Sequence, residues 1–400
     1  MSIGGALGGL FAALVAPLIF DWTYEYPILV VAAAWILGAR NPFRWLQNFW
    51  RSENAPRVAR WSVPVLLLVA LVGQGTFGLS DSPVLVSCAT AALIGLAILA
   101  IGSRIAFAAA VAALMLNTGG WSKLALSVEP DRMTRSFFGI YSIRNSRDDT
   151  RLLVHGTTIH GIQRHGTPEL ERYPTSYYAY KSGVGLALTA APRLFGDHAR
   201  IDVVGLGAGT LACYSRPGQS WRFYEIDPAV MRIARNPRQF TFLSRCLPNA
   251  DVVIGDARLT LERSPPGAAD VLVVDAFSSD SVPMHLLTRE AFRAYRRHLA
   301  PGGLLLVHIS NRFLDLRPVV AAQVSDGWTA RLRAFVPNAA EDREWQTAST
   351  WIALSPSPAT IARLEQASGP GAWTPLAPRP GFSAWTDDHA SILPIIKWSK

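Results

Sequence analysis

The sequence predicts three parts in chain order: a helical transmembrane region, a small antiparallel β-meander, and an α/β domain with a doubly wound parallel sheet. Three observations carry this prediction. Residues 1–120 hold only ten of the chain's 67 charged side chains (38 basic and 29 acidic). Short β-rich runs separated by polar turns fill residues 136–163. From residue 201 onward, apolar strands alternate with helical or loop stretches.

The first third of the chain is apolar enough to cross a membrane more than once. A helix needs about 20 apolar residues to cross the hydrocarbon core. A signal peptide is the alternative for the first apolar run, but no basic segment precedes this run and more apolar runs follow it. We therefore predict four or five transmembrane segments within residues 1–120, drawn from residues 2–20, 26–38, 62–79, 83–103 and 105–118.

Clusters of basic residues predict the orientation, because positive charges mark cytoplasmic loops. One cluster contains Arg40, Arg44, Arg51, Arg57 and Arg60. A second cluster follows Trp121 and contains Lys123, Arg132, Arg135, Arg144 and Arg147. We predict a multi-pass protein of the cell inner membrane with its globular domain in the cytoplasm. This orientation requires that residues 105–118 cross incompletely.

Composition excludes several classes of function. The net charge of +9 comes mostly from scattered Arg residues without an aromatic-basic repeat, which favours a membrane lipid surface over nucleic acid. Cys88, Cys213 and Cys246 lie far apart in the sequence, so we expect neither a disulfide framework nor a zinc site. His residues show no metal-ligand spacing either, and no metal is predicted.

The globular part divides into two predicted regions. Residues 121–170 contain the β-meander, and residues 171–400 contain the doubly wound domain, which begins with a helical stretch over residues 175–195. The strands of that domain are predicted at residues 201–205, 221–226, 251–254, 270–275, 303–309 and 349–355.

Glycine or acidic residues follow the first four of these strands. In an open α/β sheet the carboxyl ends of the strands line the ligand crevice. Glycines let the backbone approach a ligand closely, and an acid after the second strand can accept both ribose hydroxyls. We therefore predict a nucleoside-type ligand held at the strand ends by Gly205, Gly207, Glu225, Asp227, Asp256, Ala257 and Asp275.

The order of these motifs resembles the spermidine synthases, the polyamine aminopropyltransferases, over about residues 136–325. The resemblance rests on GxGxG, Glu-Ile-Asp, Gly-Asp-Ala and Val-Asp-(x)4-Asp, followed by Leu-Leu-Thr-Arg-Glu-Ala-Phe and Leu-Ala-Pro-Gly-Gly. It is closest to the membrane-fused bacterial branch of that family. It implies a Rossmann-like domain of the S-adenosylmethionine-dependent methyltransferase type, with decarboxylated S-adenosylmethionine as donor and a small amine as acceptor.

The resemblance also implies roles for single residues. It assigns Glu225 to the ribose, Asp256 with Ala257 to the adenine, and Gly205 with Gly207 to the nucleoside turn. Asp275 matches the acid that receives or orients the proton of the attacking amine. An alkylamine has a pKa of about 10.4, so it becomes a nucleophile only where a carboxylate can take its proton.

Two departures from the family pattern concern specificity. Ala208 stands where synthases carry an Asp that holds the donor's terminal amine, which leaves room for the carboxylate of intact S-adenosylmethionine. The acidic acceptor residues of spermidine synthases are not seen, so we doubt putrescine as the acceptor. The predicted substrate-binding residues are instead His160, Gln163, Tyr177, Tyr178 and Asp280.

Three hypotheses of function follow. The leading one is a membrane-anchored transferase that alkylates a small amine and releases methylthioadenosine. The second keeps the fold but transfers methyl from S-adenosylmethionine. The third is a catalytically silent nucleoside sensor coupled to the membrane segments. None involves nucleic acid, and all allow a homo-oligomer.

Overall fold

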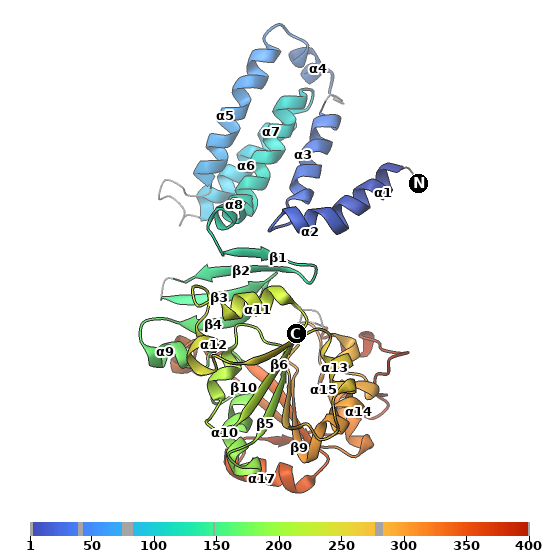
Figure 1. Cartoon of the computed structure of the whole chain (residues 1–400). Coiled ribbons are helices and arrows are strands. Elements are labelled where there is room, and N and C mark those ends of the chain that lie inside the picture. Colours follow the sequence, from blue (N-terminus) through green and yellow to red (C-terminus); the bar gives the residue numbers. More distant parts are fainter. Residues whose placement is uncertain (1–2, 39–42, 74–82, 147–148, 277–282, 399–400) are drawn as a thin grey trace. The chain divides into compact units, whose positions relative to one another are not determined.

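The computed structural model describes residues 3–38, 43–73, 83–146, 149–276 and 283–398 (Figure 1). Contacts divide the chain into two compact units, Met1–Ile140 and Tyr141–Lys400. The finer division of the globular part at residue 170 stays a prediction.

The first unit is a helical bundle that ends in a short strand. Its core is built from small and aliphatic side chains of three helices, among them Leu66, Leu93 and Ala110, and such small residues let membrane helices approach closely. The elements are α1 (Ile3–Leu10), α2 (Ala16–Ile19), α3 (Glu25–Leu37), α4 (Arg44–Trp50), α5 (Ala55–Gly73), α6 (Pro83–Ala100), α7 (Arg104–Met115), α8 (Trp121–Val128) and β1 (Met133–Arg135).

Helix lengths do not support the predicted multi-pass topology. Among the described residues, one helical stretch is long and apolar enough to cross a membrane, Arg104–Val128. The other apolar helices of this unit, Ile3–Ile19, Glu25–Leu37 and Val84–Ala100, have 17 residues or fewer. They fall short of the roughly 20 residues that a crossing requires. These lengths do not support a multi-pass topology, and the number of crossings stays a prediction.

Arg44 and Arg135, described residues of the two basic clusters within the first unit, lie at opposite ends of α3. Arg135 forms a buried, two-pronged ion pair with Glu25, the first residue of α3, with N···O distances of 2.9 and 2.7 Å. The cluster of residues 40–60 follows the other end, where the Gly38 carbonyl accepts from the Gly102 amide. A spanning bundle would therefore separate these two residues. That both clusters face the cytoplasm stays a prediction, because among the described residues only Arg104–Val128 is long and apolar enough to cross a membrane.

The second unit begins with the predicted β-meander. β2 (Ile140–Asn145), β3 (Thr150–His155) and β4 (Thr158–Arg164) pair in antiparallel order. A two-residue turn joins β3 to β4, and Gly156 occupies its left-handed position with φ +61°. The short α9 (Pro168–Arg172) follows.

An eight-stranded sheet forms the rest of this unit. Its order is β12-β10-β11-β9-β8-β5-β6-β7. The central strands β5 to β9 are parallel. The bounds are β5 (Arg200–Val204), β6 (Ser220–Glu225), β7 (Asp251–Ile254), β8 (Ala269–Val274), β9 (Leu299–His308), β10 (Thr329–Phe335), β11 (Ser349–Ser355) and β12 (Thr374–Pro375).

Two details of the sheet differ from the prediction. β11 was expected to be parallel, but it runs antiparallel to both β9 and β10. β10 was not predicted, because Arg331 and Arg333 interrupt its apolar pattern. Both strands lie beyond β9 in the sheet, where neighbouring strands pair antiparallel. The doubly wound parallel part is confirmed.

Helices cover both faces of the sheet (Figure 1). Successive side chains of a strand point to opposite faces. Val271 and Val273 of β8 pack in one core with α10 (Gly183–Phe195), while Leu272 and Val274 pack in a second core with α14 (Arg289–His298). The remaining helices are α11 (Pro228–Arg235), α12 (Phe242–Cys246), α13 (Ala257–Arg263), α15 (Arg317–Ala321), α16 (Ala339–Arg343) and α17 (Pro358–Ser368).

Candidate active site

The strand order of the sheet reverses between β5 and β8. From β5 the chain continues outward through β6 and β7, and it returns on the other side of β5 with β8. Ligands of open α/β sheets bind at the carboxyl ends of the strands beside such a point. Gly205 follows β5 with φ +97°, and a Cβ there would collide with the Asp275 carbonyl oxygen. Glycine is required here because the two strand ends meet.

The rest of the glycine turn packs against the β-meander. Gly207 has φ +53°, and a Cβ on it would lie 3.0 Å from the His160 carbonyl oxygen. Ala208 is 1% exposed. Its Cβ lies so close to Gly161 of β4 that a side chain at position 161 would collide with it. The Ala208 methyl group therefore packs on the meander, and this packing gives no support to the expectation that Ala208 leaves room for the donor's carboxylate.

Glu225, at the end of β6, is held by the backbone. Its Oε2 accepts a hydrogen bond from the Leu206 amide and its Oε1 accepts one from the Asp227 amide, both at 3.0 Å. Burial raises the pKa of Glu225 above its ordinary value, and these two hydrogen bonds only partly oppose that effect. Each carboxylate oxygen keeps acceptor capacity for a ligand hydroxyl.

The other two acids near the predicted nucleoside site begin helices. Asp227 is 1% exposed, and its Oδ1 accepts from the Ala229 amide at the start of α11. Asp256 accepts from the Leu259 amide at the start of α13, and one third of its side chain is exposed. Ala257 is nearly buried. Asp227 thus supports the strand end from inside, whereas Asp256 lies where a ligand can reach it.

Asp275, at the end of β8, is the centre of a buried cluster. Its Oδ2 accepts from the Tyr178 hydroxyl at 2.5 Å, and its Oδ1 lies 2.7 Å from His308 Nδ1. The side chains of Asp275 and His308 are only 4% and 6% exposed. Burial and the charge of Asp275 both raise the pKa of Tyr178, so its hydroxyl stays a donor.

His308 was not predicted as a site residue. Its ring is stacked between Tyr177 and Trp351, with centroid distances of 4.6 and 4.5 Å. Its Nε2 lies 2.7 Å from Ser310 Oγ, which also accepts from the Thr350 amide. Because a carboxylate only accepts hydrogen bonds, His308 Nδ1 carries the proton. The ring is therefore fixed in position and in tautomer.

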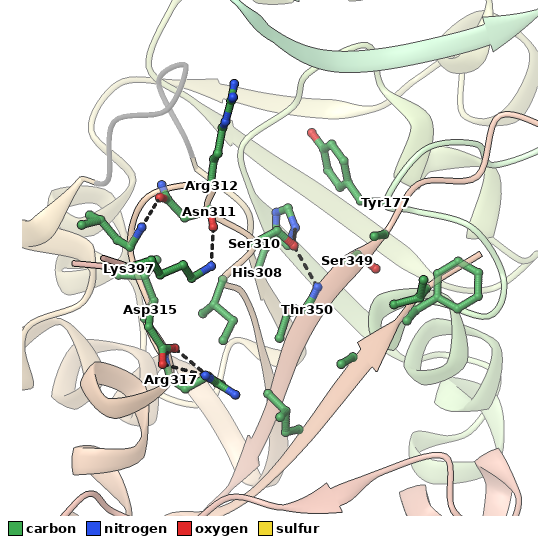
Figure 2. Close-up of a pocket in the computed structure, with 18 of the residues that line it drawn as sticks. Tyr177, His308, Ser310, Asn311, Arg312, Asp315, Arg317, Ser349, Thr350 and Lys397 are labelled. Carbon is green, nitrogen blue, oxygen red and sulfur yellow. Dashed lines mark hydrogen bonds and ion pairs between the residues drawn. The ribbon is translucent and has the colours of Figure 1, made fainter. Parts of the chain in front are cut away.

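A cavity of about 530 Å³ opens beside this cluster (Figure 2). Tyr177, His308 and His160 line it, so the predicted substrate-binding residues His160 and Tyr177 reach the same space. Tyr178 reaches Asp275 from the core instead. The rule that strand ends carry site residues could have found His308, because β9 ends at this residue.

Two predicted substrate-binding residues are not placed in this cavity. Gln163 is fully buried, and its amide is bonded to the Glu171 carbonyl, to Thr241 Oγ1 and to the Thr241 amide. Its hydrogen bonds join β4 to α9 and to the segment before α12, which is a structural role. Asp280 lies outside the described residues.

Two of the three cysteines form a single disulfide, which was not predicted from the sequence. Cys213 and Cys246 are joined, with 4.9 Å between their Cα atoms. Cys213 lies in the 3-10 helix Thr210–Tyr214 after the glycine turn, and this helix packs against α12. The two cysteines are 33 residues apart in the sequence, so local patterns do not predict their contact. Within the described ranges, no group of three or more His, Cys, Asp or Glu side chains converges as a metal site would.

Comparisons with known proteins agree with the motif order. No protein-family model matches the chain. Over 114 residues the chain is 32% identical to a polyamine aminopropyltransferase from Vibrio vulnificus (strain CMCP6), a match that covers 27% of this chain and 37% of that protein. The chain thus spans little more than a third of the length of the curated relative that it matches.

Spermidine synthases are among the solved structures that are similar to this chain. A probable spermidine synthase from Corynebacterium glutamicum has 19% identity and a TM-score of 0.45, covering 65% of this chain and 97% of that one. Spermidine synthase from Thermotoga maritima has 13% identity and a TM-score of 0.42, covering 62% and 79%. The sequence match agrees with the resemblance drawn from the motifs, and over the matched residues the chain is similar to a polyamine aminopropyltransferase.

Proposed function

We propose that the chain is an aminopropyltransferase that moves an aminopropyl group from decarboxylated S-adenosylmethionine to a small amine. The observation that carries the proposal is the Asp275 carboxylate, which Tyr178 and His308 hold beside a cavity large enough for a small acceptor. The similarity to a polyamine aminopropyltransferase supports the same reaction.

The reaction needs a neutral amine and a good leaving group. The amine nitrogen forms a bond to the carbon beside the sulfonium, the carbon–sulfur bond breaks, and its electron pair stays on sulfur as methylthioadenosine leaves. The ammonium proton must depart before or during attack, and Asp275 is the group that accepts and directs it. Because sulfonium leaves readily, positioning of the amine is the main task of the site.

The donor would lie across the carboxyl ends of β5, β6 and β7. Glu225 would accept the ribose hydroxyls, Asp256 and Ala257 would contact the adenine, and Gly205 and Gly207 would let the backbone approach. The support for these roles is the placement of all five residues at the strand ends beside the point of reversal.

The packing of Ala208 weakens the alternative hypothesis that the chain is a methyltransferase. That alternative rested on Ala208 as an opening for the intact donor, but the Ala208 side chain packs on Gly161. The curated relative is named for aminopropyl transfer.

We also propose that the first unit attaches the chain to a membrane. Its helices expose large apolar side chains, including Ile3 at 80%, Leu18 at 75% and Trp61 at 73%. Surfaces of this kind mark contact with a membrane or a partner. The enzyme proposal requires the second unit on the cytoplasmic side, where the donor is made.

The sensor hypothesis is favoured by a different observation. Disulfides persist in oxidising compartments, and Cys213 and Cys246 form one in the second unit. Such a compartment lies outside the cytoplasm, and the disulfide would favour placing the second unit there. An outside unit would not meet the donor and would bind nucleosides without turnover.

The proposed reaction is tested by product analysis. The full-length protein in detergent is incubated with decarboxylated or intact S-adenosylmethionine and a panel of primary amines, and the nucleoside product is identified by mass spectrometry. Methylthioadenosine formed only in the presence of an amine supports the proposal. S-adenosylhomocysteine would indicate methyl transfer, and binding without turnover would indicate the sensor.

A further inference from the structure

We propose that the acceptor is a primary amine that also carries an anionic group, a carboxylate or a phosphate, and not a diamine. This inference rests on the proposed function and concerns the same cavity. The observation is that cationic side chains outnumber anionic ones on the cavity wall. Among the described lining residues, Arg312, Arg317 and Lys397 face a single carboxylate, Asp315.

That carboxylate is already neutralised. Asp315 accepts two hydrogen bonds from the Arg317 guanidinium, at 2.8 and 2.7 Å. Burial alone would raise the pKa of Asp315, but these hydrogen bonds and the charge of Lys397 lower it below its ordinary value. Asp315 therefore stays ionised and paired with Arg317, and it is not available to bind the second ammonium of a diamine.

The other two cations keep free hydrogen-bonding capacity. Lys397 donates one hydrogen bond to the Asn311 carbonyl at 2.7 Å, which leaves two ammonium hydrogens. Arg312 forms no ion pair with any described residue, and its guanidinium lies 5.4 Å from the Phe313 ring centroid. Both line the same cavity as Asp315 and Arg317, and the Arg312 side chain extends away from the other three in Figure 2. Each can bind an anionic group, and the planar Arg312 guanidinium suits carboxylate or phosphate oxygens.

A further group across the cavity lacks a partner. Ser349 is 3% exposed, and its hydroxyl has no hydrogen-bond partner among the described residues. It lines the cavity together with Tyr177 and His308 (Figure 2). A buried hydroxyl is normally hydrogen-bonded. A polar acceptor that extends from Asp275 toward Arg312 would supply the missing partner.

The geometry orients such a molecule. Its amine would lie beside His308, the cavity residue that is bonded to Asp275, and its anionic end would face Arg312 or Lys397. A diamine in the same pose would bring its second ammonium toward these cations, and like charges repel at short range. Charge complementarity therefore selects among amines of equal length.

The test compares three amines with the same four-carbon chain: 4-aminobutyrate, 1-aminobutane and 1,4-diaminobutane. Full-length protein, saturating donor and methylthioadenosine release give kcat/KM for each amine. We expect 4-aminobutyrate to have the highest value and the diamine the lowest. Two further substrates distinguish a free acceptor from a lipid headgroup. They are 3-aminopropyl phosphate in solution and phosphatidylethanolamine in nanodiscs.

Single-residue variants test whether Arg312 and Lys397 cause the preference for an anionic amine. Arg312→Gln and Lys397→Gln should each raise KM for 4-aminobutyrate about three- to tenfold, as expected for partly exposed charge pairs, with little change for 1-aminobutane. Arg293→Gln, an exposed Arg of α14 outside the cavity, is the matched control. Equal losses for all three amines, or a preference for the diamine, would overturn the inference while leaving aminopropyl transfer intact. No methylthioadenosine from any amine would instead refute the proposed function.

Discussion

Glu225→Gln is the sharpest test of the nucleoside site. The carboxylate accepts from the Leu206 and Asp227 amides. In the variant, one of these N–H donors must face the amide NH₂ group, so one hydrogen bond is lost and a ribose hydroxyl loses a charged acceptor. A hydrogen bond to a charged group contributes about 1.5–3 kcal/mol. The dissociation constant for methylthioadenosine should therefore rise about 10- to 150-fold.

The pH dependence gives a second readout of the same residue. Because burial raises the pKa of Glu225, it becomes protonated at a higher pH than a free Glu side chain. Affinity for methylthioadenosine should fall as the pH falls through that raised pKa, since the protonated acid loses acceptor capacity. Glu225→Gln should show no such fall.

Isothermal titration calorimetry across pH measures both effects on the full-length protein in detergent. Glu365→Gln is the control, because Glu365 is a partly exposed carboxylate of α17 that pairs with Arg331. Unchanged affinity and unchanged pH dependence in Glu225→Gln would remove this residue from the site and refute the reasoning from the strand ends.

Three further predictions concern stability and topology. Reduction of the disulfide, or the double variant Cys213→Ser/Cys246→Ser, should remove up to about 4 kcal/mol for a closed loop of 33 residues, seen as a lower melting temperature that reductant lowers no further in the variant. Ala208→Asp should lower the melting temperature strongly without changing donor preference, because it buries a carboxylate against Gly161. A cysteine introduced beside Arg132 should be protected from an impermeant reagent in intact cells, and labelling there would favour the sensor.

Much of the donor side could be predicted because its signals are local. A glycine turn or an acid directly after an apolar strand is visible in the sequence, and the sheet brings these ends together whatever the details of packing. Gly205, Glu225 and Asp275 were found in this way, and the structure places them at the ends of β5, β6 and β8.

The acceptor side depends on contacts that local patterns do not show. His308 faces Trp351 because β9 pairs with β11 in antiparallel register, and that pairing was not predicted. Gln163 was assigned to substrate because it lies in the meander, but the side to which it points depends on the packing of α9 and Thr241. Cys213 and Cys246 likewise meet only through tertiary packing.

The central claim is that Asp275 accepts the proton of the attacking amine, and Asp275→Asn tests it most directly. The measurement is the single-turnover rate of methylthioadenosine formation at saturating donor, paired with the melting temperature. The matched control is Asp270→Asn near the start of the same strand, where Asp270 pairs with Arg200. The account predicts nearly unchanged donor affinity and a rate lowered about 10²- to 10⁴-fold. Turnover of Asp275→Asn at the wild-type rate would contradict it.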